Sequence, residues 1–268
     1  MYDFEGKVAI ITGAARGIGK ATAWAFARRG AAVAIVDING EGAEKVASNI
    51  RSQGLKALAV TTDISESNTV DNMTNQVLQE FGRIDILVNN AYISGGPALI
   101  TETSEETWDR VIAVNLKGYF NCAKAAARTM IAQRSGKIVN ISSGAGVSGS
   151  LSSGVQYPAS KAGIIGLTKG LAGELAPFGI NVNCICPGLI KTRADEEMTD
   201  PGGWTPEKVE SYIRVEVPLG RQGRPEDIAE TVVFLSSEGA SYIVGEVINV
   251  NGGDTLDSVA KRESLLGF

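Results

Sequence analysis

The chain alternates short apolar runs with longer segments in which apolar residues recur every three or four positions. The first run covers residues 7–11, and the segment after it places Ile18, Ala21 and Ala25 on one face of a helix. Unbroken apolar runs of this length are typical of strands buried on both faces, and the amphipathic segments between them are typical of helices that cover a sheet. The alternation therefore predicts an α/β fold in one domain spanning residues 1–268.

Strand-like runs are expected at residues 7–11, 32–36, 55–60, 84–88, 136–143, 180–185 and 245–250. Thr103 and Glu106 resemble a capping box, which predicts one long helix running toward Met130. The polar, irregular stretch 189–206 is longer than a loop that only connects two elements usually is. We therefore expect a substrate lid there that extends to about residue 217. The alternative is a surface insertion.

Charge and composition narrow the classes of partner. The formal net charge is −5, and the lysines and arginines form no block, so neither nucleic acid nor an anionic membrane surface is expected as a partner. No apolar stretch approaches the roughly 20 residues that span a bilayer, which predicts a cytoplasmic protein acting on small molecules. Histidine is absent, which removes serine–histidine and cysteine–histidine pairs and the commonest metal ligand, so no metal site is expected. The three cysteines, Cys122, Cys184 and Cys186, are interpreted as buried packing residues.

A glycine-rich turn follows the first predicted strand. Its glycines, Gly13, Gly17 and Gly19, precede a predicted helix. Glycines let a backbone approach a pyrophosphate, and the N-terminus of the helix offers unpaired N–H groups, so the segment predicts a dinucleotide site. The spacing is Gly-x-x-x-Gly-x-Gly instead of Gly-x-Gly-x-x-Gly, and the alternative is an ordinary turn.

Asp37 and Arg16 give opposite indications about the cofactor. Asp37 ends the second strand-like run, about 20 residues after the turn, where an acidic side chain would bind ribose hydroxyls and favour NAD. Its alternative role is a helix cap. Arg16 lies in the turn and could pair with a 2′-phosphate, which leaves NADP possible. Further along, Asp63, which precedes Ile64, could bind the adenine edge or cap the next helix.

Tyr157 and Lys161 are the acid/base candidates that remain in a chain without histidine. They are four residues apart, and a helix that begins at Pro158 would place them on one face. A cation beside a phenol lowers the tyrosine pKa from about 10 toward the range of a base at neutral pH. Ser143 follows the apolar run 137–141 and could hold a substrate oxygen. The pattern Tyr-x-x-x-Lys also arises by chance, so the spacing alone is weak evidence of function. The functional interpretation depends on where the pattern lies, close to the end of a predicted strand.

Together these residues resemble the short-chain dehydrogenases/reductases over residues 4–253. The resemblance rests on motifs in the order and approximate spacing of that family, namely Thr12, Gly13, Gly17, Gly19, Asp63, Asn89, Asn90, Ala91, Asn115, Ser143, Tyr157, Lys161, Pro187, Gly188 and Thr192. It implies a Rossmann-like three-layer αβα sandwich with a seven-stranded parallel sheet, and usually a homotetramer. The tail 254–268 is a candidate contact with a neighbouring subunit.

The resemblance also implies roles for individual residues. Tyr157 would be the acid/base, Ser143 would hold the substrate oxygen, Lys161 would contact the nicotinamide ribose and lower the tyrosine pKa, and Asn115 would anchor a water in a proton relay. Asp63 would lie near the adenine, and Ile190 and Thr192 near the nicotinamide. We therefore expect cofactor contacts from Gly13, Arg16, Gly17, Ile18, Gly19, Asp37, Asp63, Ile64, Asn90, Ala91, Tyr157, Lys161, Pro187, Gly188, Ile190 and Thr192.

Tyr92 departs from the family pattern, which usually has glycine after the Asn-Asn-Ala motif. We expect Tyr92 to pack beside the cofactor or the substrate pocket. The leading functional prediction is an NAD-dependent short-chain dehydrogenase that interconverts a secondary alcohol and a ketone, with a polyol or hydroxylated metabolite suggested by the polar stretch 148–156. The alternative is an NADPH-dependent 3-oxoacyl thioester reductase. A remote alternative is a catalytically silent dinucleotide-binding scaffold.

Overall fold

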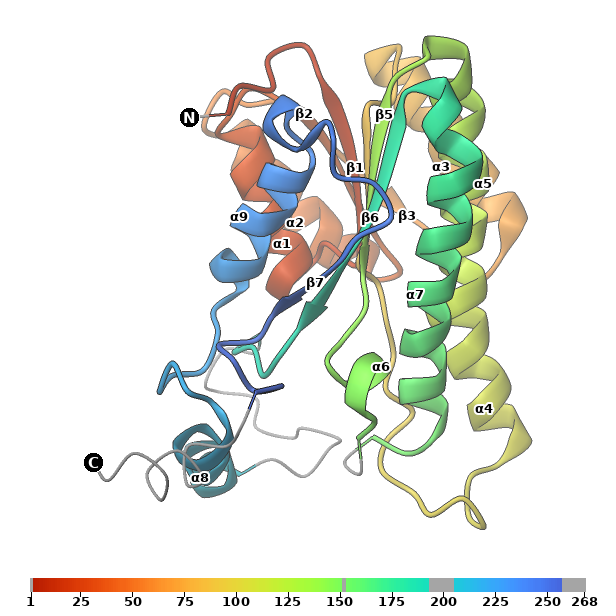
Figure 1. Cartoon of the computed structure of the whole chain (residues 1–268). Coiled ribbons are helices and arrows are strands. Elements are labelled where there is room, and N and C mark those ends of the chain that lie inside the picture. Colours follow the sequence, from red (N-terminus) through yellow and green to blue (C-terminus); the bar gives the residue numbers. More distant parts are fainter. Residues whose placement is uncertain (1, 151–152, 193–204, 257–268) are drawn as a thin grey trace.

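The structure, a computed structural model, describes residues 2–150, 153–192 and 205–256. Its strands form one parallel sheet of seven strands in the order β3-β2-β1-β4-β5-β6-β7 (Figure 1). The strands are β1 (Val8–Thr12), β2 (Ala32–Asp37), β3 (Ala57–Thr61), β4 (Ile86–Asn89), β5 (Gly136–Ile141), β6 (Ile180–Pro187) and β7 (Val247–Val250). The α-helices are α1 (Gly17–Ala27), α2 (Gly40–Arg51), α3 (Ser67–Phe81), α4 (Glu105–Ile112), α5 (Gly118–Gln133), α6 (Ala145–Ser148), α7 (Gln156–Leu175), α8 (Pro206–Glu216) and α9 (Pro225–Leu235).

Helices cover both faces of the sheet, as the unbroken apolar runs require. Helices α1, α2 and α9 lie on one face, and α3, α5 and α7 on the other (Figure 1). Neighbouring residues of β1 divide between the two cores, because Ile11 packs with the α1 side and Ile10 with the α7 side. The predicted Rossmann-like three-layer αβα sandwich with a seven-stranded parallel sheet is confirmed.

The order of the strands creates the crevice that holds the candidate site. β1 pairs with β2 on one side and with β4 on the other, so the chain changes direction across the sheet at β1. In such sheets ligands bind outside the carboxyl ends of the strands, at the point where the order reverses. β1, β4, β5 and β6 end there at Thr12, Asn89, Ile141 and Pro187.

The predicted long helix is interrupted, and its predicted cap is wrong. Ser104, not Thr103, is the N-cap of α4, and its side chain accepts a hydrogen bond from the Thr107 N–H at 3.1 Å. After α4 comes a π-helical turn, Ala113–Lys117, before the chain resumes as α5. Such a turn inserts a residue into the helix and is frequent at functional sites.

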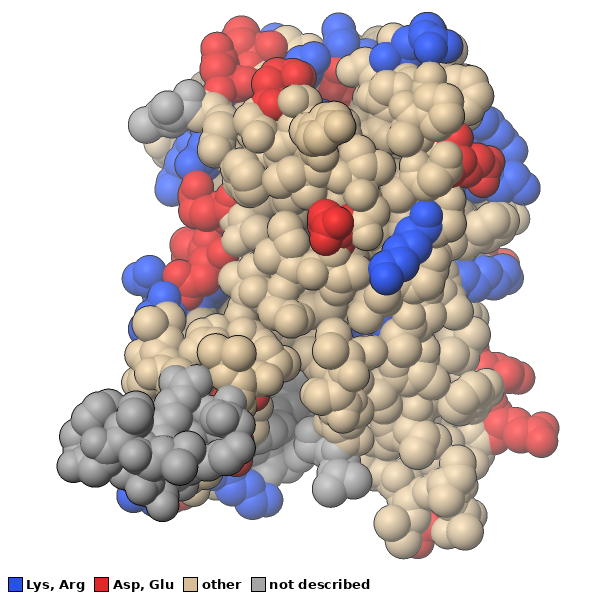
Figure 2. Space-filling model, viewed as in Figure 1, with Lys and Arg blue, Asp and Glu red and all other residues tan. Residues whose placement is uncertain are grey.

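Two further expectations concern surfaces and termini. Among the residues that the structure describes, no helix combines the length and apolar composition needed to cross a bilayer. On the face that Figure 2 shows, acidic and basic side chains are scattered mainly around the margins, and most of the surface carries neither. Part of the expected lid, 193–204, and most of the candidate contact tail, 257–268, lie outside the described residues.

Candidate active site

A cavity of about 1050 Å³ opens at the carboxyl ends of β4, β5 and β6. Helix α8 contributes Val209, Tyr212 and Ile213 to its wall, so the described part of the expected lid does border the cavity. Tyr92 lines it as well, as expected. The predicted site residues that line this cavity are Ile18, Asn90, Ser143, Tyr157, Lys161, Pro187, Gly188, Ile190 and Thr192.

Helix α7 brings Tyr157 and Lys161 together on one face. The helix begins at Gln156, so Pro158 lies in its first turn and does not open it as predicted. The Nζ atom of Lys161 lies 5.6 Å from the centre of the Tyr157 ring. Ser143 follows β5, accepts a hydrogen bond from the Ala145 N–H at 3.1 Å, and hydrogen-bonds with the Tyr157 side chain. The tyrosine, lysine and serine thus meet at one end of the cavity.

Tyr157 does not have the lowered pKa expected beside Lys161, and the effect of a charged Lys161 on it stays a prediction. Burial, reinforced by Tyr92, raises the pKa of Tyr157 well above its usual value of 10.0, and the hydrogen bond with Ser143 opposes that shift without cancelling it. Burial also lowers the pKa of Lys161 from 10.5 to about 7, which brings the loss of its charge into the neutral pH range. Tyr157 is therefore protonated here, which suits it to donate a proton.

Asn115 lies in the π-helical turn and binds the chain beside the cavity. Its Oδ1 accepts a hydrogen bond from the Ile93 N–H, and its Nδ2 donates to the Ile93 carbonyl, both at 2.9 Å. Nδ2 also donates to Ser160 Oγ at 3.0 Å. The buried amide thus fixes the segment after β4 against α7, and its role in anchoring a relay water stays a prediction.

The glycine turn packs so closely that side chains would not fit. A Cβ on Gly13 would lie 2.7 Å from Ala91 Cα, and one on Gly19 would lie 2.3 Å from the Gly13 carbonyl oxygen. Asn90 Nδ2 donates to the carbonyls of Thr12 and Gly13 at 2.9 and 3.1 Å, which ties the end of β4 to the turn. Gly13 and Gly17 have φ of 65° and 55°, a region that favours glycine.

Asp37 closes the other side of the turn. Its Oδ2 accepts from the Ala15 N–H and its Oδ1 from the Asn39 N–H, both at 3.0 Å. The cap of α2 is Asn39, whose side chain accepts from the Gly42 N–H, so Asp37 is not a helix cap. Arg16 precedes α1 and is exposed.

Asp63 is held by protein partners and is not a helix cap either. It forms an ion pair with Arg110 at 3.0 Å and accepts from the Ser65 N–H and hydroxyl. Burial raises the pKa of Asp63, but the hydrogen bonds with Ser65 and Arg110 outweigh it and hold the pKa below 3.8. Ile64 is buried and packs against Gly118, where a Cβ would meet it at 2.7 Å. Contacts of Asp63 and Ile64 with adenine stay predictions.

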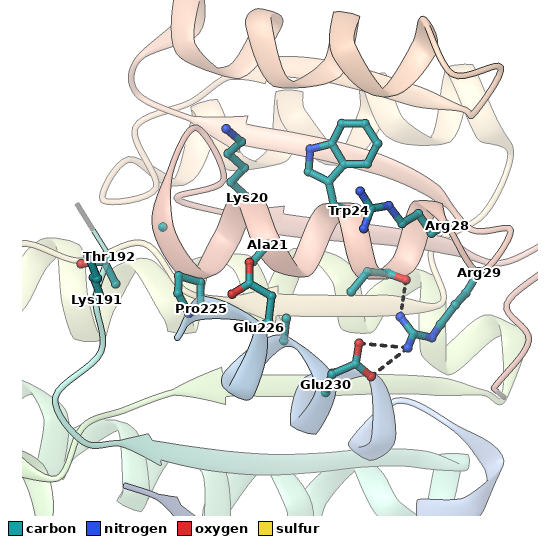
Figure 3. Close-up of a pocket in the computed structure, with 13 residues that line it drawn as sticks. Lys20, Ala21, Trp24, Arg28, Arg29, Lys191, Thr192, Pro225, Glu226 and Glu230 are labelled. Atoms are coloured by element: carbon teal, nitrogen blue, oxygen red, sulfur yellow. Dashed lines mark hydrogen bonds and ion pairs between the residues drawn. The ribbon is translucent and has the colours of Figure 1, made fainter. Parts of the chain in front are cut away.

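A second cavity of about 380 Å³ lies between α1 and α9. Figure 3 shows Lys191 and Thr192 at one end and the ion pair of Arg29 with Glu230, at 2.8 Å, at the other. Lys191 and Thr192 line both cavities. The smaller cavity holds none of the acid/base residues, which places the chemistry in the larger one.

Three residues of the site were not predicted. Tyr119 is fully buried, and its hydroxyl donates to the Ile141 carbonyl at 3.1 Å. Its spacing of four from Asn115 was the available signal, because residues four apart share a helix face. Ser142 Oγ donates to the Lys161 carbonyl at 2.8 Å, and the buried Gln156 side chain donates to loop carbonyls, including that of Gly96 at 3.2 Å. Ser142 had the same signal as Ser143, since both follow the apolar run 137–141 at a predicted strand end, whereas Gln156 had none beyond its neighbours in the chain.

The doubly wound sheet, the glycine turn and the cavity at the strand ends define an oxidoreductase with a dinucleotide cofactor. Residues 13–255 match the family model described as enoyl-(acyl carrier protein) reductase, and the chain belongs to the short-chain dehydrogenase/reductase family. The predicted family is thereby confirmed.

Known relatives cover nearly the whole chain. The chain is 43% identical over 249 residues to the 3-oxoacyl-(acyl-carrier-protein) reductase FabG of Thermotoga maritima, which covers 93% of this chain and 98% of that protein. It is 41% identical over 252 residues to the (2S)-((R)-hydroxy(phenyl)methyl)succinyl-CoA dehydrogenase subunit BbsD of Thauera aromatica, covering 94% and 98%. A crystal structure of a 3-oxoacyl-(acyl-carrier protein) reductase from Brucella melitensis with bound NAD has a TM-score of 0.83 at 34% identity, covering 93% of this chain and 91% of that one.

Proposed function

We propose that the protein is an NAD(H)-dependent oxidoreductase that interconverts 3-hydroxyacyl and 3-oxoacyl thioesters, with Tyr157 as the acid/base. The observation that carries the reaction type is the buried Tyr157, with Ser143 and Lys161 beside it, at the carboxyl ends of the strands. The substrate class is supported by the relatives, whose names share an acyl group on a carrier protein or coenzyme A and an oxo or hydroxy group. The relatives thus favour the predicted alternative substrate over a polyol.

Two features of the structure fit a dinucleotide cofactor. The close packing of Gly13 and Gly19 leaves a cradle without side chains, and no side chain of the described residues caps the N-terminus of α1. The N–H groups of the first turn are therefore available to a pyrophosphate. The Asp37 carboxylate, held by two N–H groups beside the turn, supports NAD(H), because it would repel a 2′-phosphate. When bound, the nicotinamide supplies or accepts the hydride.

The residues of the chain handle the proton. In the reducing direction the carbonyl carbon gains a hydride, and its oxygen gains the phenolic proton of Tyr157. Burial keeps that proton on the phenol until the oxygen becomes basic. Ser143, which hydrogen-bonds with Tyr157, would hold the same oxygen. In the oxidising direction the phenolate must form first, and the charge on Lys161 would favour it.

Turnover of a small substrate panel tests this proposal. Acetoacetyl-coenzyme A, a polyol and a simple secondary alcohol are each offered with NAD(H) and NADP(H), to the wild type and to Tyr157→Phe. We expect reduction of the thioester with NADH, loss of at least about 99% of turnover in Tyr157→Phe, and NADH binding within about twofold of wild type in that variant. A tenfold preference for NADPH would refute the cofactor assignment.

The serine-rich lining, with Ser94, Ser148 and Ser153, supports a small polar alcohol as the second candidate. Activity confined to the polyol would establish that candidate and reject the thioester. Binding of NADH with no turnover of any substrate would support the catalytically silent scaffold.

We also propose the homotetramer that the family resemblance implies. It is supported by the apolar side chains of Leu99, Ile100, Trp108 and Phe120, which are exposed around α4 and α5. Sedimentation equilibrium gives the mass directly, and a monomer at micromolar concentration would contradict the proposal.

A further inference from the structure

Lys161 is a buried amine that has no carboxylate partner among the described residues. Its side chain is only 1% exposed, and its Nζ donates to the Ile141 carbonyl at 2.9 Å. Within the described part of the chain, no aspartate or glutamate forms an ion pair with it. Buried lysines are ordinarily paired, because an isolated ammonium is costly to remove from water. Other groups must therefore stabilise the charged form.

Three tyrosine rings surround the Nζ atom. The ring centres of Tyr92, Tyr157 and Tyr119 lie 5.1, 5.6 and 5.7 Å away, within the roughly 6 Å at which the ring quadrupole attracts a cation. They come from three separate parts of the fold: the segment after β4, helix α7 and helix α5. Among the described residues, the other titratable groups that face Lys161 are the thiols of Cys184 and Cys186 on β6, which raise its pKa against the effect of burial. We call the three rings the aromatic cage.

Tyr92 differs from the other two members of the cage. Tyr119 is fully buried, whereas Tyr92 is 51% exposed and lines the large cavity. Its ring contacts that of Tyr157 edge to face, with centres 6.0 Å apart and an interplanar angle of 61°. Tyr92 is thus the member of the cage on the cavity side, where the family pattern usually has no side chain.

The backbone fixes Tyr92 from both sides. Before it, the N–H groups of Asn90 and Ala91 donate to Thr12 Oγ1 at 2.9 and 3.1 Å. After it, Ile93 exchanges two hydrogen bonds with the Asn115 amide. The ring is therefore presented by a segment tied to β1 and to the π-helical turn, and does not depend on a free loop.

We propose that Tyr92 is a positioning residue whose ring closes the aromatic cage and favours the ammonium form of Lys161. The inference rests on the proposed function, in which Lys161 supports proton transfer at Tyr157. Burial alone disfavours the charged form, and the ring face opposes that effect while keeping water from Nζ. A glycine at this position would leave Nζ open to the cavity on that side.

The test measures the ionisation of Lys161 directly. Wild type, Tyr92→Phe and Tyr92→Leu are prepared with lysine labelled with carbon-13 at Cε, and the Lys161 signal is assigned from its loss in Lys161→Met. Phenylalanine keeps the ring, and leucine keeps most of the bulk but removes the ring face. We expect Tyr92→Leu to lower the pKa of Lys161 by about 1 and Tyr92→Phe to leave it within about 0.3 of wild type.

Controls make the result specific to the cage. Tyr242 is fully exposed, so Tyr242→Leu repeats the same substitution away from the site and should leave the titration unchanged. Thermal unfolding confirms that each variant is folded, and Tyr92→Met replaces Tyr92→Leu if the latter does not fold. An unchanged pKa in the leucine or methionine variant would overturn the proposal. An equal fall in Tyr92→Phe would also overturn it, because the hydroxyl and not the ring would then be responsible.

Kinetics supply a second measurement. If Lys161 must be charged for turnover, the alkaline limb of the kcat/KM profile should move about 1 pH unit lower in Tyr92→Leu and stay in place in Tyr92→Phe. The two proposals fail separately, because the titration needs no turnover. A protein that reduces no thioester but shows the expected titration would refute the proposed function alone, and active protein with an unchanged titration would refute the cage alone.

Discussion

Replacing Lys161 with methionine should make the protein more stable at low pH while removing its activity. Methionine has a similar length and no charge, so Lys161→Met removes the cost of burying an ammonium without opening a large cavity. Lys161 is fully buried, and burial lowers its pKa from 10.5 in the free side chain to about 7. That difference corresponds to about 5 kcal/mol of disfavoured charge, an upper figure because the structure can relax around the ion.

The sign of the pH dependence follows from proton counts. Between about pH 7 and pH 10.5 the unfolded chain keeps the lysine proton and the folded protein has lost it, so stability rises with pH in that window. Below about pH 7 both states are protonated, and the folded state carries the full cost of the buried charge. From about pH 6 to about pH 9 this one group should add about 3 kcal/mol to the free energy of unfolding of the wild type.

Urea unfolding of both proteins at a fixed protein concentration measures the difference. The other titratable groups are common to the two chains, so the difference between their curves reports Lys161 together with the thiols of Cys184 and Cys186 that interact with it. We expect Lys161→Met to exceed wild type by about 2–4 kcal/mol near pH 6 and the gap to close toward pH 9. A gap that does not change with pH would refute the reasoning, because it would mean that the lysine is not neutralised in the folded protein.

Three further predictions concern the cofactor site and the sheet. Asp37→Asn should reduce the preference for NADH over NADPH about tenfold or more in fluorescence titrations, with the exposed Asp109→Asn as control; an unchanged ratio would remove Asp37 from cofactor recognition. Gly19→Ala should abolish NADH binding in calorimetry, since its Cβ would lie 2.3 Å from the Gly13 carbonyl oxygen; tight binding would contradict the close packing of the turn. Asp85→Ala should lower the free energy of unfolding by about 2–4 kcal/mol, because it leaves the buried Val8 N–H without its acceptor at 2.9 Å; a loss below about 0.5 kcal/mol would contradict that account.

The sequence was sufficient to predict the order of strands and helices because burial on two faces leaves a clear period in the chain. β1 and β2 lie within one residue of their expected bounds, while β3 and β4 begin two residues later than expected. The glycine turn and Asp37 could also be located, since each depends on a position relative to a strand end. Strand ends are set by pairing with neighbouring strands, which the sequence does not display. The observed ends of the strands therefore differ from the predicted ends by up to two residues.

The interruption of the long helix was not predictable from periodicity. The π-helical turn at Ala113–Lys117 adds a residue without breaking the apolar pattern, which continues through Leu116 and Phe120. Ser104 and Thr103 are both good caps, and only the backbone geometry shows which one precedes the first turn. Asn115 could be recognised as unusual inside a helix, but its partners at Ile93 and Ser160 are distant in the chain.

Sequence spacing could predict that Tyr157 and Lys161 are neighbours, but not their pKa values. Spacing places a lysine beside a tyrosine, but whether the lysine lowers the tyrosine pKa depends on how much water each group keeps. Both are buried, so each is pushed toward its neutral form, and the expected phenolate is not favoured. In the oxidising direction, where the phenolate must form, proton transfer would be helped by a feature that restores part of the charge on Lys161. The aromatic cage that includes Tyr92 can stabilise the ammonium form of Lys161. The sequence alone shows Tyr92 only as a residue that departs from the glycine usual in this family.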